Sequence, residues 1–265
     1  MSTITNHSDR SNALLEEFEF YVINLDRSQE RWQRINDHLH NLGLVAQRIS
    51  AVDAAQYDNV FLSKHYNESL NKKSFFIGLK PAEIGCFLSH RKALKAFLTD
   101  SKKKYAVILE DDVEFVADPR QFCGQWRTVL NGNDAVMLKL FKRRAISGEW
   151  VDRCERTGVV RPRLVPLGTQ SQIVNRRAAK ALLTAFEQFS MPVDAAYQHW
   201  WQHGVKVLVT VPNQINEISK AVGGTNIGGS IGLSFGFKAQ REIKRSWFRL
   251  KLKFVSAWFY FKSSR

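Results

Sequence analysis

The feature that most restricts the fold is a strand–helix–strand pattern between residues 18 and 53. Residues 18–24 (FEFYVIN) form an aromatic and β-branched run, which is typical of a strand. Apolar residues then recur at helical spacing from Trp32 to Leu42, and Gly43 is expected to end the helix. Residues 47–52 predict a second strand. Because strands joined through a helix pair in parallel, the pattern predicts an α/β fold with a mostly parallel central sheet flanked by helices.

Another predicted strand ends in three acidic residues. Residues 105–109 (YAVIL) predict a short buried strand, and Glu110, Asp111 and Asp112 follow it directly. Adjacent carboxylates at a buried strand repel one another and lose hydration, which is unfavourable for each of them. A divalent cation such as Mg²⁺ or Mn²⁺ would remove that penalty, and open α/β sheets bind ligands at this edge. A solvated acidic turn is the alternative reading of the triplet.

A long helix is predicted over residues 79–98, with Pro81 in its first turn. Glu83 and His90 are seven residues apart and therefore share a face of this helix, with Ser89 beside them. The grouping indicates a candidate site, although a single histidine on a helix is more often structural than catalytic.

Two arginines, Arg27 and Arg31, lie one helical turn apart just after the first strand. Planar guanidinium groups match the geometry of phosphate, so both side chains could reach one phosphate group. The alternative is that both are ordinary solvated arginines on an exposed helix face.

An acid also precedes an aromatic cluster near the end of the predicted domain. Asp194 is followed by Tyr197, Trp200 and Trp201. An acid beside aromatic rings is a common way to hold and activate a sugar, while a tryptophan pair can equally be ordinary core.

The remaining segments carry weaker signals. The sequence predicts a partly helical insertion (54–77), strands (134–141, 172–175 and 205–211), a polar and basic loop region (142–163), and a helix (176–189). In the strand over 134–141, Lys139 is expected to face opposite to its apolar neighbours.

Positive charge is concentrated at the C-terminal end of the chain. The 265 residues carry a net charge of +14, and residues 238–265 contain nine lysines and arginines against one acid. In this tail, apolar residues from Ile243 to Phe261 recur every three or four positions. Basic residues beside a face of Trp and Phe are typical of an interfacial amphipathic helix that binds anionic lipid. A helix packed on the domain and a nucleic-acid-binding arm are the alternatives.

Cellular location is suggested by two features. The three cysteines form no CxxC pair, and the polar N-terminal stretch lacks the apolar core of a secretory signal. We therefore expect a cytoplasmic protein, and a lipid-binding tail would keep it peripheral on the inner face of the cytoplasmic membrane.

Four ordered motifs resemble glycosyltransferase family 25. They are NLDR at 24–27 with Arg31 after it, EIGCFLSHRKA at 83–93, VILEDDV at 107–113, and GTQSQIVNRRAAKALL at 168–183 followed by MPVDAAY at 191–197. The resemblance covers about residues 18–215. The family includes bacterial lipopolysaccharide or lipooligosaccharide β-galactosyltransferases and procollagen galactosyltransferases, and the bacterial type is the better comparison. The chain departs from the pattern at Gln172, where many members carry Tyr.

The resemblance implies roles for particular residues. Mn²⁺ or Mg²⁺ would be held by Asp112 and Glu110, and the general base would be Asp194 or, second, Glu83. A third metal ligand would come from His199, His203 or water. Residues expected to bind the donor are Asn24, Arg27, Arg31, Ser89, His90, Glu110, Asp111, Gly168 and Thr169.

The resemblance also implies an activity and a domain plan. The expected reaction is inverting transfer of a hexose, galactose first, from a UDP-sugar to a lipid-linked oligosaccharide such as a lipopolysaccharide core. The alternative is a nucleic-acid-binding or nucleotidyl-transferring protein that uses the acidic triplet and the basic tail. The plan comprises a flexible leader (1–17), a GT-A-like, Rossmann-type domain (18–220), a glycine-rich loop (221–237) and a membrane-associating tail (238–265).

Overall fold

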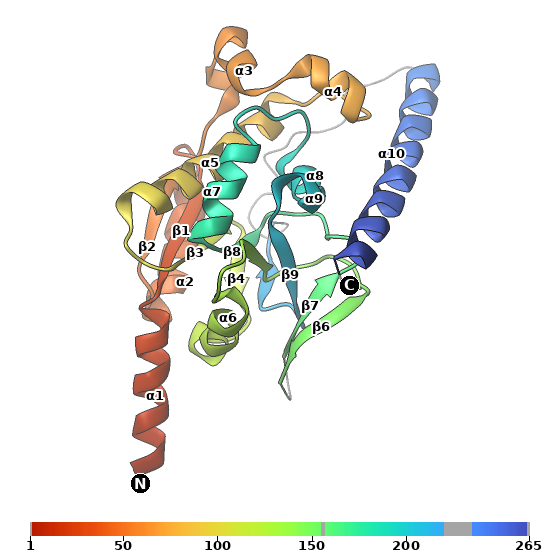
Figure 1. Ribbon diagram of the computed structural model, residues 1–265. Helices are drawn as coiled ribbons and strands as arrows, with labels where there is room; N and C mark the ends of the chain where they lie inside the picture. Colours follow the sequence, from red (N-terminus) through yellow and green to blue (C-terminus); the bar gives the residue numbers. More distant parts are fainter. Residues whose placement is uncertain (1, 155–156, 220–234, 264–265) are drawn as a thin grey trace.

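A computed structural model describes residues 2–154, 157–219 and 235–263, the side chains of 2–8 and 235–239 excepted. Its centre is an eight-stranded mixed sheet with the order β2-β1-β3-β8-β5-β9-β7-β6 (Figure 1). Only β8 and β7 run against the direction of the other strands of this sheet. The strands are β1 (Phe18–Asn24), β2 (Ala46–Ser50), β3 (Tyr105–Glu110), β5 (Val136–Lys139), β6 (Gly148–Arg153), β7 (Gly158–Pro162), β8 (Ser171–Asn175) and β9 (Lys206–Val211). The predicted α/β class with a mostly parallel sheet is confirmed.

Helices cover both faces of this sheet. Side chains alternate along β3, so Ala106 and Ile108 point into one hydrophobic core while Val107 and Leu109 point into the other. The first core lies under α5, α7 and α8, and the second lies under α2 and α6. The helices are α1 (Ser2–Leu15), α2 (Gln29–Asn41), α3 (Asn59–His65), α4 (Glu68–Ser74), α5 (Pro81–Asp100), α6 (Cys123–Leu130), α7 (Arg176–Ala185), α8 (Val193–Tyr197), α9 (Trp200–His203) and α10 (Phe235–Lys262), with 3₁₀ turns at Ala54–Gln56 and Pro119–Gln121.

The carboxyl ends of three strands meet at one edge of the sheet. In the parallel trio β2-β1-β3, Asn24 is level with Ser50 and Ile23 is level with Glu110. The antiparallel β8 starts at this same edge, where Ser171 pairs with Leu109. A second, two-stranded sheet of β4 (Val113–Phe115) and β10 (Ile215–Glu217) flanks the edge. The chain therefore brings distant polar segments together here.

Several local predictions were wrong. The region 142–163 contains the hairpin β6–β7, which extends the sheet, because its apolar residues alternate too weakly to predict strands. The leader, expected to be loose, folds as α1 and is tied to the body by a hydrogen bond from Arg120 Nε to Asn12 Oδ1 of 2.6 Å. The helix predicted to reach residue 189 ends at Ala185. Most of the glycine-rich loop predicted over 221–237 lies outside the described residues.

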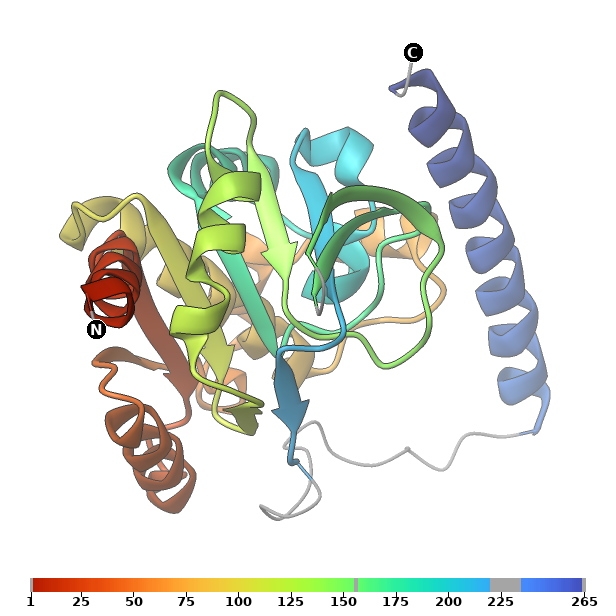
Figure 2. The ribbon, with the colours of Figure 1, turned by 90° about the horizontal axis from the view of Figure 1, so that it is seen from below.

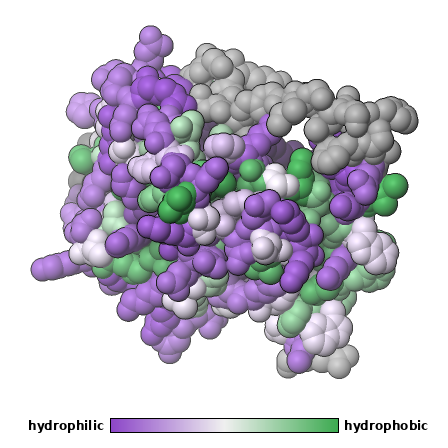
Figure 3. Space-filling view, turned by 90° about the horizontal axis from the view of Figure 1, so that it is seen from above, coloured by the Kyte–Doolittle hydropathy of each residue, from purple (hydrophilic) through white to green (hydrophobic). Residues whose placement is uncertain are grey.

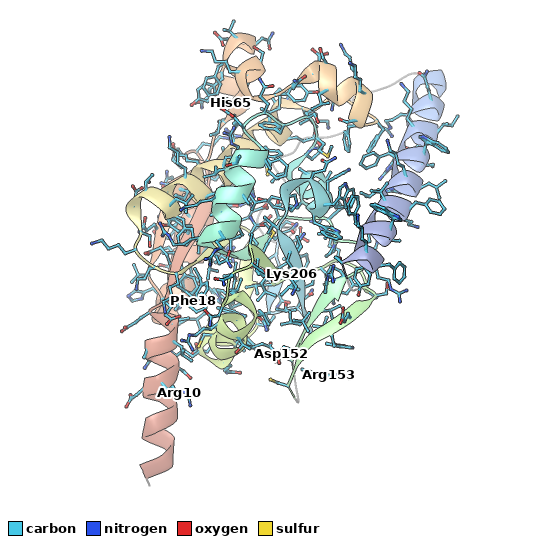
Figure 4. All side chains as sticks on the ribbon, in the orientation of Figure 1. Arg10, Phe18, His65, Asp152, Arg153 and Lys206 are labelled. Atoms are coloured by element: carbon cyan, nitrogen blue, oxygen red, sulfur yellow. The ribbon has the colours of Figure 1, made fainter. Side chains whose placement is uncertain are left out.

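The tail forms the predicted amphipathic helix, α10, which lies along one side of the body (Figure 2). Side chains leave α10 both toward the body and away from it (Figure 4). On the inner face, the ring of Phe259 stacks on Trp201 with a centroid separation of 5.5 Å, and Ser256 Oγ donates to Arg163 O at 2.7 Å. The alternative prediction, that the tail helix packs on the domain, is therefore confirmed for the inner face of α10.

Helix α5 carries candidate site residues and approaches the chain after β2 very closely. A side chain on Gly85 would place its Cβ 2.3 Å from Val52 O, so only glycine permits this approach. One turn later, Ser89 Oγ accepts a hydrogen bond from Val52 N at 2.8 Å and donates to Gly85 O at 2.6 Å. Gly85 and Ser89 together fix α5 against the segment 51–54, and thereby fix the position of His90.

Replacing Gly85 with alanine should move α5 and destabilise the protein. Alanine favours a helix by about 1 kcal/mol over glycine, but the clash with Val52 O should outweigh this gain. We expect the free energy of unfolding to fall by about 1–3 kcal/mol in urea titrations. The matched control is Gly124→Ala in α6, where an added Cβ meets nothing within 4 Å and stability should not fall. A Gly85→Ala protein as stable as wild type would contradict this account of the contact.

Candidate active site

A cavity of about 460 Å³ opens at the edge where β1, β2 and β3 end. Eleven of the twelve residues predicted as bases, donor-binding residues or first metal ligands line it; Asn24 does not, and neither do His199 and His203, the candidates for a third metal ligand. The lining residues from that set are Arg27, Arg31, Glu83, Ser89, His90, Glu110, Asp111, Asp112, Gly168, Thr169 and Asp194. The fold thus gathers four separate motifs around one space, while the role of each residue remains a prediction.

Asp111 is held from behind by Asn24. The side chain of Asn24 donates to Asp111 Oδ2 at 2.6 Å, and its own Oδ1 accepts from Arg48 Nη2 at 2.6 Å. Arg31 forms an ion pair with Asp111 from the other side. Burial raises the pKa of Asp111 against the opposing effects of Asn24 and Arg31. Asn24 and Asp111 therefore support the wall of the cavity, and Asn24 reaches a ligand only through Asp111.

Glu110 belongs to a buried hydrogen-bonded chain. Its Oε1 accepts from Thr169 Oγ1 at 2.6 Å and lies 3.3 Å from His90 Nε2. Gln172 Nε2 donates to His90 Nδ1 at 3.0 Å, which leaves Nε2 as the ring nitrogen that can donate toward Glu110. Burial pushes the pKa of Glu110 upward, but His90 and Thr169 outweigh it and the pKa lies below its usual value. Glu110 is therefore kept ionised, with Oε2 receiving no hydrogen bond from the described residues.

Asp112 is the least satisfied acid of the cavity. Its side chain is buried, and Oδ1 has no hydrogen-bond partner among the described residues. Arg31 Nη2 lies 3.3 Å from the other oxygen. Burial and the charge of Glu110 raise the pKa of Asp112 to about 7, against the pull of Arg31. A buried carboxylate oxygen without a donor fits a cation, because hard cations prefer such oxygens.

The overall charge of the cavity also favours a cation. Seven carboxylates line it, those of Asp53, Glu83, Glu110, Asp111, Asp112, Asp194 and Glu217, against the three guanidinium groups of Arg27, Arg31 and Arg143. Arg27 pairs with Asp53, and Arg143 pairs with Glu217 at 2.5 Å. The excess of acids would repel a phosphorylated ligand that arrived without a counter-ion.

A second possible ligand set is less suited to Mg²⁺ or Mn²⁺. Ligand atoms of Cys86, His90 and Glu110 lie within 4.8 Å of one another. Burial raises the pKa of the Cys86 thiol well above its usual value, so the thiolate is unavailable and hard cations favour the carboxylates. His199 and His203, expected as alternative third ligands, line no part of this cavity and bond to the backbone of Ala195 and Tyr197. That expectation was wrong for both histidines.

The opposite wall carries the two candidate bases. Asp194 lies in the first turn of α8, and its Oδ2 accepts from Gly168 N at 3.0 Å. Glu83 accepts from Lys80 N at 2.8 Å, so it also caps the start of α5. Lys139, buried beneath, donates to Gly168 O at 2.6 Å, and burial lowers its pKa to about 8. The Gly168 loop is therefore clamped between an acid and a buried lysine.

The structure adds residues that the sequence did not reveal. Arg143 and Glu217 reach the cavity from segments without a motif, and only the pairing of β4 with β10 brings Glu217 there. Lys139 stood out as a lysine in an apolar strand, but its complete burial was not predicted. Ser89 was predicted to bind the sugar donor. Its hydroxyl donates its hydrogen to Gly85 O, so Ser89 can only accept a hydrogen bond from a ligand.

Comparison with known proteins gives both sequence and distant structural resemblances. A sequence profile described as glycosyltransferase family 25 (LPS biosynthesis protein) matches residues 18–197. A glycosyltransferase 25 family member from Anopheles gambiae is 32% identical over 102 residues, which cover 36% of this chain and 16% of that protein. A glycosyltransferase 25 family member from Aedes aegypti is 30% identical over 102 residues, which again cover 36% of this chain and 16% of that protein. The chain thus spans 16% of the length of these relatives. The solved structure of A197 from STIV shares 14% identity and a TM-score of 0.39 over 72% of this chain and 80% of that one.

Proposed function

Because the chain belongs to glycosyltransferase family 25, we propose that it transfers a hexose from a UDP-sugar to a lipopolysaccharide or lipooligosaccharide core, inverting the anomeric carbon. Galactose is the proposed sugar, and Mn²⁺ or Mg²⁺ the proposed cofactor. The observation that carries the proposal is the buried Asp112 oxygen that has no partner among the described residues, in an acidic cavity at the carboxyl ends of parallel strands. Family membership favours glycosyl transfer over the nucleic-acid hypothesis.

The donor would bind along the acidic edge. Asp112 and Glu110 each offer an oxygen that accepts no hydrogen bond from the residues that the structure describes, and these oxygens would hold the ion. A divalent cation bound there would stabilise the charge that develops on the leaving UDP. With the acids neutralised, Arg31 and Arg27 can exchange their present carboxylate partners for the diphosphate.

The acceptor hydroxyl needs a base, because inversion by a single displacement releases its proton. Asp194 is our first candidate and Glu83 the second. The bond from Gly168 N fixes the Asp194 carboxylate, yet each of its oxygens keeps a lone pair for a proton. Glu83 already has a structural task as the cap of α5. His90 donates toward Glu110 and serves to keep that acid ionised.

We also propose that α10 holds the enzyme on the inner face of the cytoplasmic membrane. Six large apolar side chains of α10 are exposed, those of Ile243, Trp247, Leu250, Phe254, Trp258 and Phe261. Figure 3 shows green and white atoms along the right edge of the molecule, the side on which α10 lies in Figures 1 and 2. In the described part of the chain, no helix combines the length and hydrophobicity that crossing a bilayer requires. A helix with this stripe beside basic residues would lie in the interface.

The first prediction concerns the metal and Asp112. UDP release from UDP-galactose and UDP-glucose should require Mn²⁺ or Mg²⁺ and stop with EDTA. Asp112→Asn should lower the rate by more than about 100-fold, because it removes the proposed ligand charge. Asp152→Asn is the control, since Asp152 of β6, labelled in Figure 4, does not line the cavity. Release that persists in EDTA and in Asp112→Asn would exclude the metal role.

The second prediction identifies the base. Asp194→Asn should lower kcat for transfer by about 10²–10⁴-fold with little change in donor KM, because the base acts on the acceptor. Glu83→Gln keeps the capping hydrogen bond and should lower kcat by less than about tenfold. The reverse order of effects would assign the base to Glu83.

The third prediction concerns the membrane. In flotation with vesicles that contain phosphatidylglycerol, Trp247→Ser/Phe254→Ser/Trp258→Ser should reduce the bound fraction about tenfold or more, since it removes the apolar face. Val45→Ser/Val60→Ser, at exposed positions outside α10, is the control. Added salt should weaken wild-type binding by screening the basic residues. Equal flotation of the triple variant and wild type would refute the membrane role of the stripe.

A further inference from the structure

A second cavity, of about 540 Å³, lies between α10 and the body of the protein. It shares three residues with the cavity described above, namely Glu83, Pro192 and Asp194. The two candidate bases therefore stand where the two cavities meet. A group held in the second cavity could present a hydroxyl to Asp194 from the side opposite to the donor.

The charge of the second cavity is opposite to that of the first. Five basic side chains line it, those of Arg144, Arg241, Arg245, Arg249 and Lys253, while its only carboxylates among the described residues are the shared Glu83 and Asp194. Arg241 and Arg245 both pair with Glu242 on their own helix. Among the described residues, Arg144, Arg249 and Lys253 form no ion pair with a carboxylate. The second cavity, called the basic groove from here on, thus has cations without an acidic partner in the described structure, and it adjoins the acidic first cavity.

The rest of the groove is apolar and aromatic. Phe248 of α10 packs edge-on against Phe75 with a centroid separation of 5.1 Å and lies 5.6 Å from Phe76. Leu252, one turn further along α10, is buried in the same wall. An apolar wall with a few convergent charged groups is the usual make-up of a site for an organic ligand. Here the charged groups select an anion.

We propose that this groove is the acceptor subsite and that the acceptor is a phosphorylated saccharide. Its phosphate would bind Arg245 and Arg249, whose guanidinium groups match phosphate oxygens, with Arg144 and Lys253 adding charge. A sugar ring would lie against Phe248, and the reacting hydroxyl would point to Asp194. This inference rests on the proposed function. Because α10 forms one wall, the helix that would touch the membrane also selects the substrate.

The test separates the acceptor phosphate from the lipid surface. Two soluble acceptors are compared, a de-acylated lipooligosaccharide core that carries its phosphates and the same core after dephosphorylation with hydrofluoric acid. The variant is Arg245→Gln/Arg249→Gln. The control is Lys244→Gln/Lys251→Gln, which removes the same charge from α10 at exposed positions that do not line the groove. Neither acceptor has acyl chains, so membrane binding does not enter the kinetics.

We expect the arginine variant to raise the acceptor KM about tenfold or more for the phosphorylated core, since charged hydrogen bonds are lost. For the dephosphorylated core, KM should already be high in wild type and change less than about twofold in the variant, which is the signature of coupling between arginine and phosphate. The lysine control should resemble wild type with both acceptors.

Three outcomes would overturn the inference. Equal effects of the arginine variant on both acceptors would mean that the arginines only hold α10 in place. An unchanged KM with weaker vesicle flotation would assign the arginines to lipid headgroups. Wild-type protein that releases UDP but transfers to neither core would reject the phosphorylated acceptor, and with it the core acceptor of the proposed function, but would leave the metal-dependent use of a UDP-sugar donor standing. Absence of metal-dependent UDP release would instead defeat the proposed function itself.

Discussion

The placing of three consecutive carboxylates at the end of β3, two of them buried and Glu110 partly buried, is the constraint on which the site depends. Desolvation disfavours the charged form of each acid; the pKa values of Asp111 and Asp112 are raised, whereas that of Glu110 is lowered because its hydrogen-bond partners outweigh burial. Glu110 accepts hydrogen bonds from Thr169 and His90. Asp111 accepts a hydrogen bond from Asn24 and forms an ion pair with Arg31. Oδ1 of Asp112 has no hydrogen-bond partner in the described part of the chain. Of the three acids, Asp112 therefore has the fewest interactions, and it is the position at which a bound cation would compensate best for burial.

The residues that contact the three acids come from distant parts of the sequence, and the mixed sheet brings them together. The parallel strands β1 and β3 place Asn24 and Glu110 at one edge. Between β3 and β5, the antiparallel β8 starts at that edge, so the Gly168–Gln170 loop before it lies over the acids. Gln172, on β8, then reaches His90 of α5 and fixes its ring. A wholly parallel sheet would have put this loop at the opposite edge.

The two cavities divide the chemistry of the molecule by charge. The acidic cavity is suited to a cation with a diphosphate, and the basic groove is suited to an anion, with Asp194 and Glu83 between them. The groove exists only because α10 packs on the body through Phe248, Phe259 and Ser256. The same helix keeps an apolar stripe on its outer face. The tail can therefore pack on the domain and still offer a lipid-binding surface, so two of the alternatives for it are compatible.

The sequence by itself determined the α/β class, the strand–helix–strand start, the acidic end of β3, the amphipathic tail and eleven of the residues that line the cavity. These features follow from local periodicity and from motifs, because both depend on residues that are close together in the sequence. It did not determine the hairpin β6–β7, in which β7 pairs with β9 and β6 pairs with β7 at the edge of the sheet. Nor could it show that Lys139 is buried, that Arg143 meets Glu217, or that His199 and His203 turn away from the acids. Those facts depend on strand order and helix packing between segments far apart in the chain, which only the tertiary structure decided.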